Sequence, residues 1–396
     1  MVVDSFDLAR LPAVSFGDGA LMRVPELAAS FGKRLLLVTG AESFRGSRHW
    51  PAFSAALEQQ DLGWESLTVK GEPSPEMVDE AVSKFRESGV DAVVGIGGGS
   101  VLDAAKAVAG LLPHGNSVRD HLEGVGKGIP YAGPSLPLIA VPTTAGTGSE
   151  ATKNAVLSAP GKEGYKKSFR HEALVARHAV IDPLLLESCP PELVAADGMD
   201  ALTQLIESFV STSSNPFTEA LVMGALEAVR DGLFPWYEGK DDTRAARSRM
   251  AYAAWISGIA LAQTGLGAVH GLASPLGAFF PAPHGVVCGT LLASATEANV
   301  EALRAREPDN RALGRYARVH AVLSASDRVD VDEGPEALVG LLREWTARLN
   351  LPGLRGYGVR DSDIERVVVD SRGSSMRTNP IELSDEEIAA VLRERL

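Results

Sequence analysis

Cysteine and long apolar runs are both scarce in this sequence. Only two cysteines, Cys189 and Cys288, occur among the 396 residues, and because they lack metal-type spacing we expect two reduced, buried thiols. No apolar run approaches the about 20 residues that a membrane helix needs. Residues 1–7 lack a basic region followed by an apolar stretch, so no secretory signal is predicted. These absences favour a cytoplasmic protein without a membrane partner.

Basic charge and two widespread catalytic motifs are also missing. The chain carries 51 acidic residues against 38 lysines and arginines, a net charge of −13. Such a surface repels the phosphates of nucleic acids, so we predict no nucleic-acid partner. The chain has no Gly-x-x-x-x-Gly-Lys-Ser/Thr loop for P-loop chemistry and no Gly-x-Ser-x-Gly elbow for an α/β-hydrolase.

The apolar pattern divides the chain into two parts. Residues 1–185 alternate apolar strands with amphipathic helices, which is typical of a parallel α/β sheet. Strands are expected at 33–38, 65–69, 91–96, 138–141, 154–157 and 173–181, and helices at 50–60, 74–87 and 100–111. Residues 186–396 show almost only helical periodicity, with helices expected at 191–211, 216–233, 243–262, 285–299, 310–324, 335–349, 361–371 and 384–395. The sequence thus predicts an α/β domain followed by an all-α domain.

Two loops that follow predicted strands are candidates for cofactor binding. Gly97-Gly98-Gly99-Ser100 joins the strand at 91–96 to a helix, and such glycines let the backbone approach a diphosphate. A tight structural turn explains these residues equally well. The loop at 142–149 carries four Thr or Ser hydroxyls after another buried strand. Two such loops at strand ends of one sheet favour a dinucleotide in the crevice there.

Polar residues also interrupt the apolar helical part. Asp200 and Gln204, four residues apart, share one face of a helix, and Glu207 lies near that face. His270 and His284 follow in a segment rich in glycine, alanine and proline. One carboxylate and two imidazoles in an apolar setting can bind Zn²⁺ or Fe²⁺. Two hydrogen-bonded core histidines and a capping aspartate are the structural alternative, and the residues alone leave both open.

Five motifs together resemble the iron-containing (group III) alcohol dehydrogenase family over essentially the whole chain. They are Gly-Gly-Gly-Ser-x-x-Asp-x-x-Lys at 97–106, Pro-Thr-Thr-x-Gly-Thr-Gly-Ser-Glu at 142–150, Asp-Pro at 182–183, Gly-Met-Asp-Ala-Leu-Thr at 198–203 and His-Gly-Leu-Ala…Pro-His-Gly at 270–285. The resemblance implies a Rossmann-like N-terminal domain, a helical metal and substrate domain, and a cleft between them, a dehydroquinate synthase-like architecture. It also implies reversible hydride transfer between NAD(P)H and a small aldehyde or alcohol.

The resemblance assigns cofactor roles to individual residues. It implies that the glycine turn holds the pyrophosphate, that the threonine loop contacts phosphate and nicotinamide, and that Lys166 contacts the cofactor. The cofactor-binding residues predicted here are Gly40, Ser43, Gly97, Gly98, Gly99, Ser100, Asp103, Thr143, Thr144, Thr147 and Lys166. On the helix after the first loop, Asp103 and Lys106 form either an exposed ion pair or a brace for the loop.

One departure from the family concerns the metal. Family members bind a metal through one Asp and three His, and Asp200, His270 and His284, our predicted catalytic residues, match three of these positions. Gln204 stands at the fourth, where its amide oxygen is a weaker ligand than imidazole. Ser274 replaces a further family histidine that is often given a proton-relay role. Two hypotheses stay open: a metal, with Zn²⁺ favoured over Fe²⁺, or a metal-free reductase in which a histidine donates the proton, as in maleylacetate reductases.

A second departure concerns the choice of nucleotide. Family members that prefer NAD carry an aspartate where Gly40 stands after the strand at 33–38. Without that carboxylate a 2′-phosphate is not repelled, and Ser43 and Arg45 are within reach of it. We predict NAD(P) use with a preference for NADP, while a simple turn glycine is the alternative explanation.

Two other functions compete with the dehydrogenase. A lyase like the dehydroquinate synthases needs basic phosphate-binding residues. The apolar residues near His270 disfavour it and suggest a small, largely uncharged carbonyl substrate; they are Leu272, Leu276, Phe279 and Phe280. A non-catalytic cofactor-binding homologue would explain the altered metal ligands. By analogy with the family, residues 13–17 are expected to form a strand that pairs two copies into a homodimer.

Overall fold

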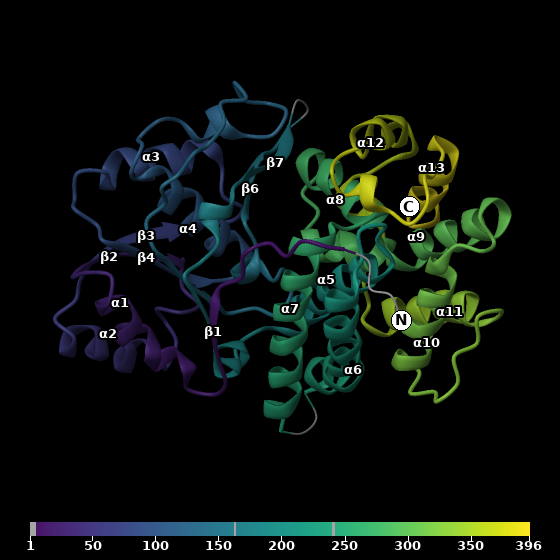
Figure 1. Cartoon of the computed structure of the whole chain (residues 1–396), viewed down its shortest axis with the longest axis horizontal. Coiled ribbons are helices and arrows are strands. Elements are labelled where there is room, and N and C mark those ends of the chain that lie inside the picture. The colour runs from purple at the N-terminus through teal and green to yellow at the C-terminus, as the bar shows by residue number, and fades with distance from the viewer. Residues whose placement is uncertain (1–4, 162–163, 240–241) are drawn as a thin grey trace. The chain divides into compact units, whose positions relative to one another are not determined.

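The computed structural model describes residues 5–161, 164–239 and 242–396, which belong to two compact units (Figure 1). The sheet unit comprises Ala9–Ala159 and Lys166–Cys189, and the helical unit is Pro190–Leu396 with two short segments, one before Ala9 and one between Ala159 and Lys166. The change of unit after Cys189 lies close to the division predicted after residue 185. The sequence pattern does not single out the two short segments.

Six parallel strands form the sheet, in the order β1-β8-β5-β4-β2-β3. They are β1 (Ala13–Phe16), β2 (Arg34–Gly40), β3 (Gly63–Val69), β4 (Ala92–Gly97), β5 (Leu138–Pro142) and β8 (His178–Ile181), and the α-helices between them are α1 (Val24–Ala29), α2 (Trp50–Gln59), α3 (Pro75–Phe85) and α4 (Gly99–Leu111). Every residue of β4 and β5 is buried, as expected for a parallel sheet covered on both faces. The predicted α/β class is confirmed.

The strand order reverses next to β2. The chain passes from β2 to β3 on one side and then to β4 on the other. Thr39 of β2 lies opposite Ile96 of β4, and Gly97 of β4 opposite Pro142 of β5. The loops that follow these three strands therefore leave the same edge of the sheet. Open α/β sheets bind ligands at this carboxyl edge, where the strand order reverses.

Two expectations for the strands are wrong. Only His178–Ile181 of the predicted strand at 173–181 is a strand, because His171 caps a short 3₁₀ turn at Glu172–Leu174 through its Nδ1. The strand β7 (Tyr165–Arg170) was not predicted, since its polar sequence has no apolar run. It pairs with β6 (Asn154–Ala159) in a separate two-stranded sheet.

Nine α-helices follow Pro190 in the part of the chain that the structure describes. They are α5 (Pro191–Val210), α6 (Pro216–Glu238), α7 (Arg244–Thr264), α8 (Ala268–Phe279), α9 (His284–Arg306), α10 (Arg311–Leu323), α11 (Gly334–Arg348), α12 (Ile364–Asp370) and α13 (Asp385–Glu394). The eight expected helices are confirmed, and α8 is additional, because its glycines and Pro275 hide it in the sequence. The long helix α5 is almost entirely buried and packs against α6, α7 and α9.

A membrane-spanning helix is not found among the described residues. No single helix there combines the necessary length and apolar character. Among the described residues, only α7 and α8 taken together have this length and apolar character, and the two helices meet at a bend of 100°.

Candidate active site

The two predicted cofactor loops lie against each other in the sheet unit. A Cβ on Gly99 would lie 2.7 Å from Cγ2 of Thr147, and one on Gly98 would lie 3.3 Å from Cγ2 of Thr144. The first of these contacts is too short for any side chain, so the approach of the loops requires glycine. Gly98 is also the N-cap of α4. A helix N-terminus beside threonine hydroxyls is suited to bind a phosphate.

A buried ion pair braces the second loop. Lys106 is 1% exposed, and its Nζ donates to the carbonyl of Ser149 at 2.9 Å and to Oγ1 of Thr152 at 2.8 Å. Asp103 lies 3.1 Å from that Nζ and accepts from Oγ of Ser149 at 2.6 Å. The exposed-pair alternative is therefore wrong, and the brace is what the structure shows. A direct contact of Asp103 with a cofactor stays a prediction.

The brace holds ionisable groups in a dry environment. Burial lowers the pKa of Lys106, although Asp103 acts in the opposite direction. Burial raises the pKa of Glu150 to about 7, although the Lys106 ammonium opposes this. These two groups and Asp103 are kept together because each would be costly to bury alone.

The residues predicted to select the nucleotide lie where β2 ends. Gly40 does not have a positive φ, and a Cβ there would make an ordinary contact of 3.5 Å with Oγ of Ser43. The backbone conformation at position 40 therefore does not require glycine. The guanidinium of Arg45 lies 4.8 Å from the ring centre of Trp50 and donates to Oγ of Ser66 at 2.9 Å. Arg45 thus places a positive charge near this end of the strand.

Lys166 is held by a carboxylate. Its Nζ lies 2.5 Å from Oε1 of Glu72, and the other oxygen of Glu72 accepts from Ser158. The lysine is on β7 of the two-stranded sheet. Its predicted contact with the cofactor stays a prediction.

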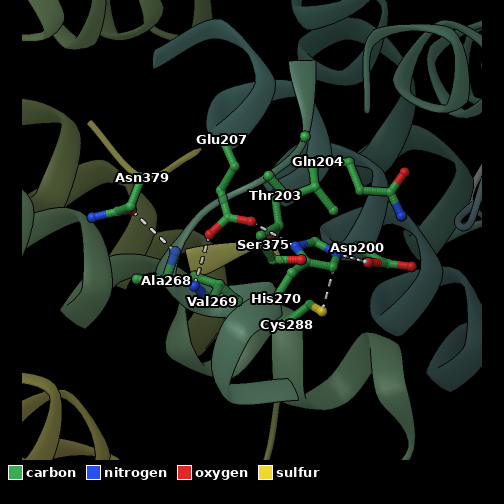
Figure 2. A network of polar contacts seen from close by, with 12 residues as sticks. Asp200, Thr203, Gln204, Glu207, Ala268, Val269, His270, Cys288, Ser375 and Asn379 are labelled. Carbon is green, nitrogen blue, oxygen red and sulfur yellow. Dashed lines mark hydrogen bonds and ion pairs between the residues drawn. The ribbon is translucent and has the colours of Figure 1, made fainter. Parts of the chain in front are cut away.

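Three predicted catalytic residues from three helices converge in the helical unit. Asp200 comes from α5, His270 from α8 and His284 from the first position of α9. Nε2 of His270 lies 3.3 Å from Oδ1 of Asp200, and Nε2 of His284 lies 3.8 Å from the same oxygen. Figure 2 shows the Asp200 carboxylate directed at the ring of His270. The two histidines therefore form one site with the aspartate and are not separate core residues.

The charge of this cluster is incompletely satisfied. Asp200 is 1% exposed, and its Oδ1 makes no hydrogen bond of good geometry with the residues that the structure describes. Burial would raise the pKa of Asp200, but His284 and His270 hold it at about 2. Burial opposes the charged form of His270, yet Cys288, Glu207 and Asp200 raise its pKa well above the usual value. A buried carboxylate that is stabilised by nearby positive charge is suited to bind a divalent cation.

Glu207 orients His270. Its Oε2 lies 2.6 Å from Nδ1 of His270, and its Oε1 accepts from the backbone N–H of Val269 at 2.7 Å (Figure 2). With Nδ1 bonded to this carboxylate, Nε2 is left to face Asp200. Carboxylate–histidine pairs of this kind fix the ring of a metal-binding histidine. The sequence showed Glu207 near the face of Asp200 but not this contact, which depends on the unpredicted helix α8.

The start of α8 is fixed by the same residues. Asn379 Oδ1 accepts from the backbone N–H of Ala268 at 3.0 Å. A Cβ on Gly267 would lie 2.8 Å from this oxygen and 2.9 Å from Oε1 of Glu207. Glycine is therefore needed at the N-cap, because two side chains from distant segments cap the helix in place of a local one.

Oε1 of Gln204 accepts a hydrogen bond from Ser257 at 2.7 Å, and its predicted role as a weak fourth ligand stays a prediction. Cys288 lies at the same cluster, which the sequence did not predict. Cys288 lies one turn after His284 on α9, and its Sγ is 3.7 Å from Nε2 of both His270 and His284. The donor atoms of these two histidines, Asp200 and Cys288 all lie within 4.8 Å of one another. Burial raises the pKa of the Cys288 thiol to about 12.

The two thiols are therefore not equivalent. Cys288 is buried as predicted, but it lies among polar groups and not in an apolar pocket. Cys189 is only half-buried, so the expectation that both are buried is wrong for this one. The spacing of His284 and Cys288, four residues apart, was the available signal, because such residues share a helix face.

The apolar residues near His270 have a structural role. Leu272 and Leu276 are fully buried in the core of the helical unit. The ring of Phe279 lies under the guanidinium of Arg366, 3.8 Å from its carbon. Leu272, Leu276 and Phe279 therefore do not indicate an uncharged substrate.

A parallel sheet whose carboxyl edge is suited to bind a dinucleotide, together with a buried cluster of carboxylate and imidazole groups, is typical of a cofactor-dependent oxidoreductase. Comparison with known proteins identifies the family within this class. Residues 12–183 match the family described as "Iron-containing alcohol dehydrogenase", and residues 194–396 match "Fe-containing alcohol dehydrogenase family, C-terminal". The chain belongs to the iron-containing alcohol dehydrogenase family, whose members are oxidoreductases.

Similarity to individual members extends over the whole chain. This chain is 33% identical over 389 residues to alcohol dehydrogenase 4 of Saccharomyces cerevisiae, with 97% of each chain covered. It is 28% identical to the NADPH-dependent butanol dehydrogenase of Clostridium saccharobutylicum, with 96% of this chain and 95% of the relative covered. The crystal structure of an archaeal halo-thermophilic alcohol dehydrogenase from a Red Sea brine pool matches with a TM-score of 0.91 at 27% identity, covering 100% of both chains.

Proposed function

We propose that this protein reduces small aldehydes to alcohols, and catalyses the reverse oxidation, with NADP(H) as an accepted cofactor and with a divalent metal. The observation that carries the proposal is the convergence of Asp200, His270 and His284 on one buried point. Family membership supports NAD(P)-dependent alcohol and aldehyde oxidoreduction over the lyase and the non-catalytic alternatives.

The residues present fit a metal. The oxygen of Asp200 that lacks a hydrogen bond and the two imidazole nitrogens form a donor set of the type that binds Zn²⁺ or Fe²⁺. When bound, the metal polarises the substrate carbonyl and stabilises the alkoxide that develops as hydride arrives. Asp200, His270 and His284 would hold the metal, and Glu207 fixes the ring of His270 through Nδ1, which leaves Nε2 available as a ligand atom.

The first experiment combines elemental analysis with a turnover assay. We expect the purified protein to contain up to one divalent metal per chain and to oxidise NADPH in the presence of small aldehydes, followed at 340 nm. Turnover that survives complete metal removal would favour the metal-free alternative of the maleylacetate reductase type. No turnover with any aldehyde, with or without added metal, would refute the proposed function.

The nucleotide preference rests on Gly40 and Arg45. No carboxylate stands at Gly40 to repel a 2′-phosphate, and the NADPH-dependent butanol dehydrogenase is a relative that uses this nucleotide. The variant Gly40→Asp should lower kcat/KM for NADPH about tenfold or more, because a carboxylate would face the phosphate. An unchanged ratio of NADPH to NADH activity would show that the end of β2 does not select the nucleotide.

The edge strand β1 supports assembly into a homodimer. It pairs with β8 on one side of the sheet and with no other strand among the described residues. Val14 is 36% exposed and Phe16 is 41% exposed, and an open edge with apolar side chains is suited to pair with a second copy. Light scattering should give twice the chain mass, and Val14→Lys should lower the mass measured in this way.

The scarcity of cysteine favours a cytoplasmic location for this protein.

A further inference from the structure

Cys288 lies where a fourth metal ligand is expected. Its Sγ is 3.7 Å from Nε2 of both His270 and His284, and these nitrogens are 3.3 and 3.8 Å from Oδ1 of Asp200. In a tetrahedral zinc site, with bonds of about 2.0 Å to nitrogen or oxygen and about 2.3 Å to sulfur, neighbouring donors are about 3.3–3.6 Å apart. Four of the six donor–donor separations lie within about half an ångström of these edges, and all six are at most 4.8 Å.

A second observation points to a ligand at the same place. Oδ1 of Asp200 is buried and lacks a hydrogen bond of good geometry. Cys288 is completely buried in the same cluster. This oxygen of Asp200, two imidazole nitrogens and a sulfur lie close together inside the helical unit, and a cation would satisfy all four donor atoms.

Gln204 is engaged elsewhere. Its Oε1 accepts a hydrogen bond from Ser257 of α7, whereas the thiol is directed at His270 (Figure 2). The residue at the family's fourth ligand position is thus committed to a neighbouring helix. The available fourth donor comes from α9, one turn after His284.

We propose that Cys288 is the fourth protein ligand of the metal, bound as a thiolate together with Asp200, His270 and His284. The inference rests on the metal centre of the proposed function. As the metal–sulfur bond forms, the S–H bond breaks and its proton passes to solvent, so no oxidation state changes. Two anionic ligands then balance the charge of a divalent ion. A soft thiolate favours Zn²⁺ or Co²⁺ over Fe²⁺.

Cobalt reports a thiolate ligand directly. The wild type and the variants Cys288→Ser, Gln204→Ala and Cys189→Ser are stripped with a chelator and reloaded with Co²⁺. The wild type, Gln204→Ala and Cys189→Ser should show a thiolate-to-cobalt charge-transfer band in the near ultraviolet. Cys288→Ser should lack the band and bind Co²⁺ about tenfold or more weakly.

A second measurement needs no variant. X-ray absorption of the zinc-loaded wild type should show one sulfur neighbour at about 2.3 Å. Cobalt or zinc bound without any sulfur neighbour would overturn the thiolate ligand and leave the metal-assisted function standing. A band that survives Cys288→Ser would also overturn it. Wild type that binds no metal at all would refute both the ligand and the metal part of the proposed function, while NADPH turnover would still test the reductase activity separately.

Discussion

The glycine and threonine loops of the sheet unit and the ligand cluster of the helical unit are built in opposite ways. The loops owe their shape to backbone and glycine, and Lys106 and Asp103 behind them already satisfy one another. The cluster consists of side chains from three helices, and a buried oxygen of Asp200 remains without a hydrogen bond. The charged groups of the first site are paired with one another, whereas the second site keeps an oxygen that a cation could bind. The following changes test this contrast.

The largest effect is expected when the brace behind the loops is broken. Lys106→Met leaves the buried Glu150 and the partly buried Asp103 without their cation, which should lower the free energy of unfolding by about 3–5 kcal/mol. Lys153→Met is the matched control, because Lys153 pairs with Glu172 at the surface and should cost about 1 kcal/mol or less. Denaturant titration measures both. Equal midpoints for the two variants would show that the buried pair contributes no more than a surface pair.

Glu150 should make the sheet unit sensitive to pH. Its pKa is raised from 4.5 to about 7 by burial, so the folded state binds this proton more tightly than the unfolded chain. The stabilisation is complete below about pH 4.5 and is lost as the pH rises through about 7. Glu150→Gln should therefore gain up to about 3 kcal/mol relative to wild type between pH 5 and pH 8. A difference between the two proteins that does not change with pH contradicts the shift.

The close approach of the loops can be tested by adding one methyl group. Gly99→Ala places a Cβ 2.7 Å from Cγ2 of Thr147, which should displace the loop and weaken NADPH binding about 10–50-fold. The double variant Gly99→Ala/Thr147→Gly should recover part of the loss, since it removes the clashing atoms. Gly340→Ala, where a Cβ meets no atom within 4 Å, is the control. Full affinity in Gly99→Ala, measured by fluorescence titration, would show that the loops adapt freely.

The smallest effect is expected at the carboxylate behind the cluster. Glu207→Gln keeps the shape of the side chain but removes the charge that fixes Nδ1 of His270, and should weaken Zn²⁺ binding about tenfold. Asn379→Ala removes the bond to Ala268 at the start of α8 together with those to Asn299 and Ile381, but it leaves the Glu207–His270 contact in place. It should weaken Zn²⁺ binding less. Competition with a chromogenic chelator measures both affinities. If the two variants lose the same affinity, Glu207 acts through the helix and not through the histidine.

The same contrast explains which features the sequence reveals. The loops at 97–100 and 142–149 are continuous in sequence and follow buried strands, so local pattern predicts their place at the sheet edge. The triad of Asp200, His270 and His284 depended on a resemblance to known proteins. Cys288 and Glu207 were missed as site residues because both contact His270, which lies on a different helix, α8. The helix α8, which brings His270 to them, has a composition rich in glycine with an internal proline, and that composition argues against a helix.

The capping of α8 by Asn379 links the ligand cluster of Asp200, His270 and His284 to the C-terminal part of the chain. Asn379 also donates to the side chain of Asn299 at 2.6 Å and to the carbonyl of Ile381 at 2.8 Å. The segment around Asn379 is therefore a structural component of the candidate active site. A truncation before Asn379, or a fusion that strains this segment, should loosen the start of α8 and with it the histidine one turn further on. For protein engineering, this makes the C-terminal segment an unsuitable place for shortening and a useful place for tuning metal affinity from a distance.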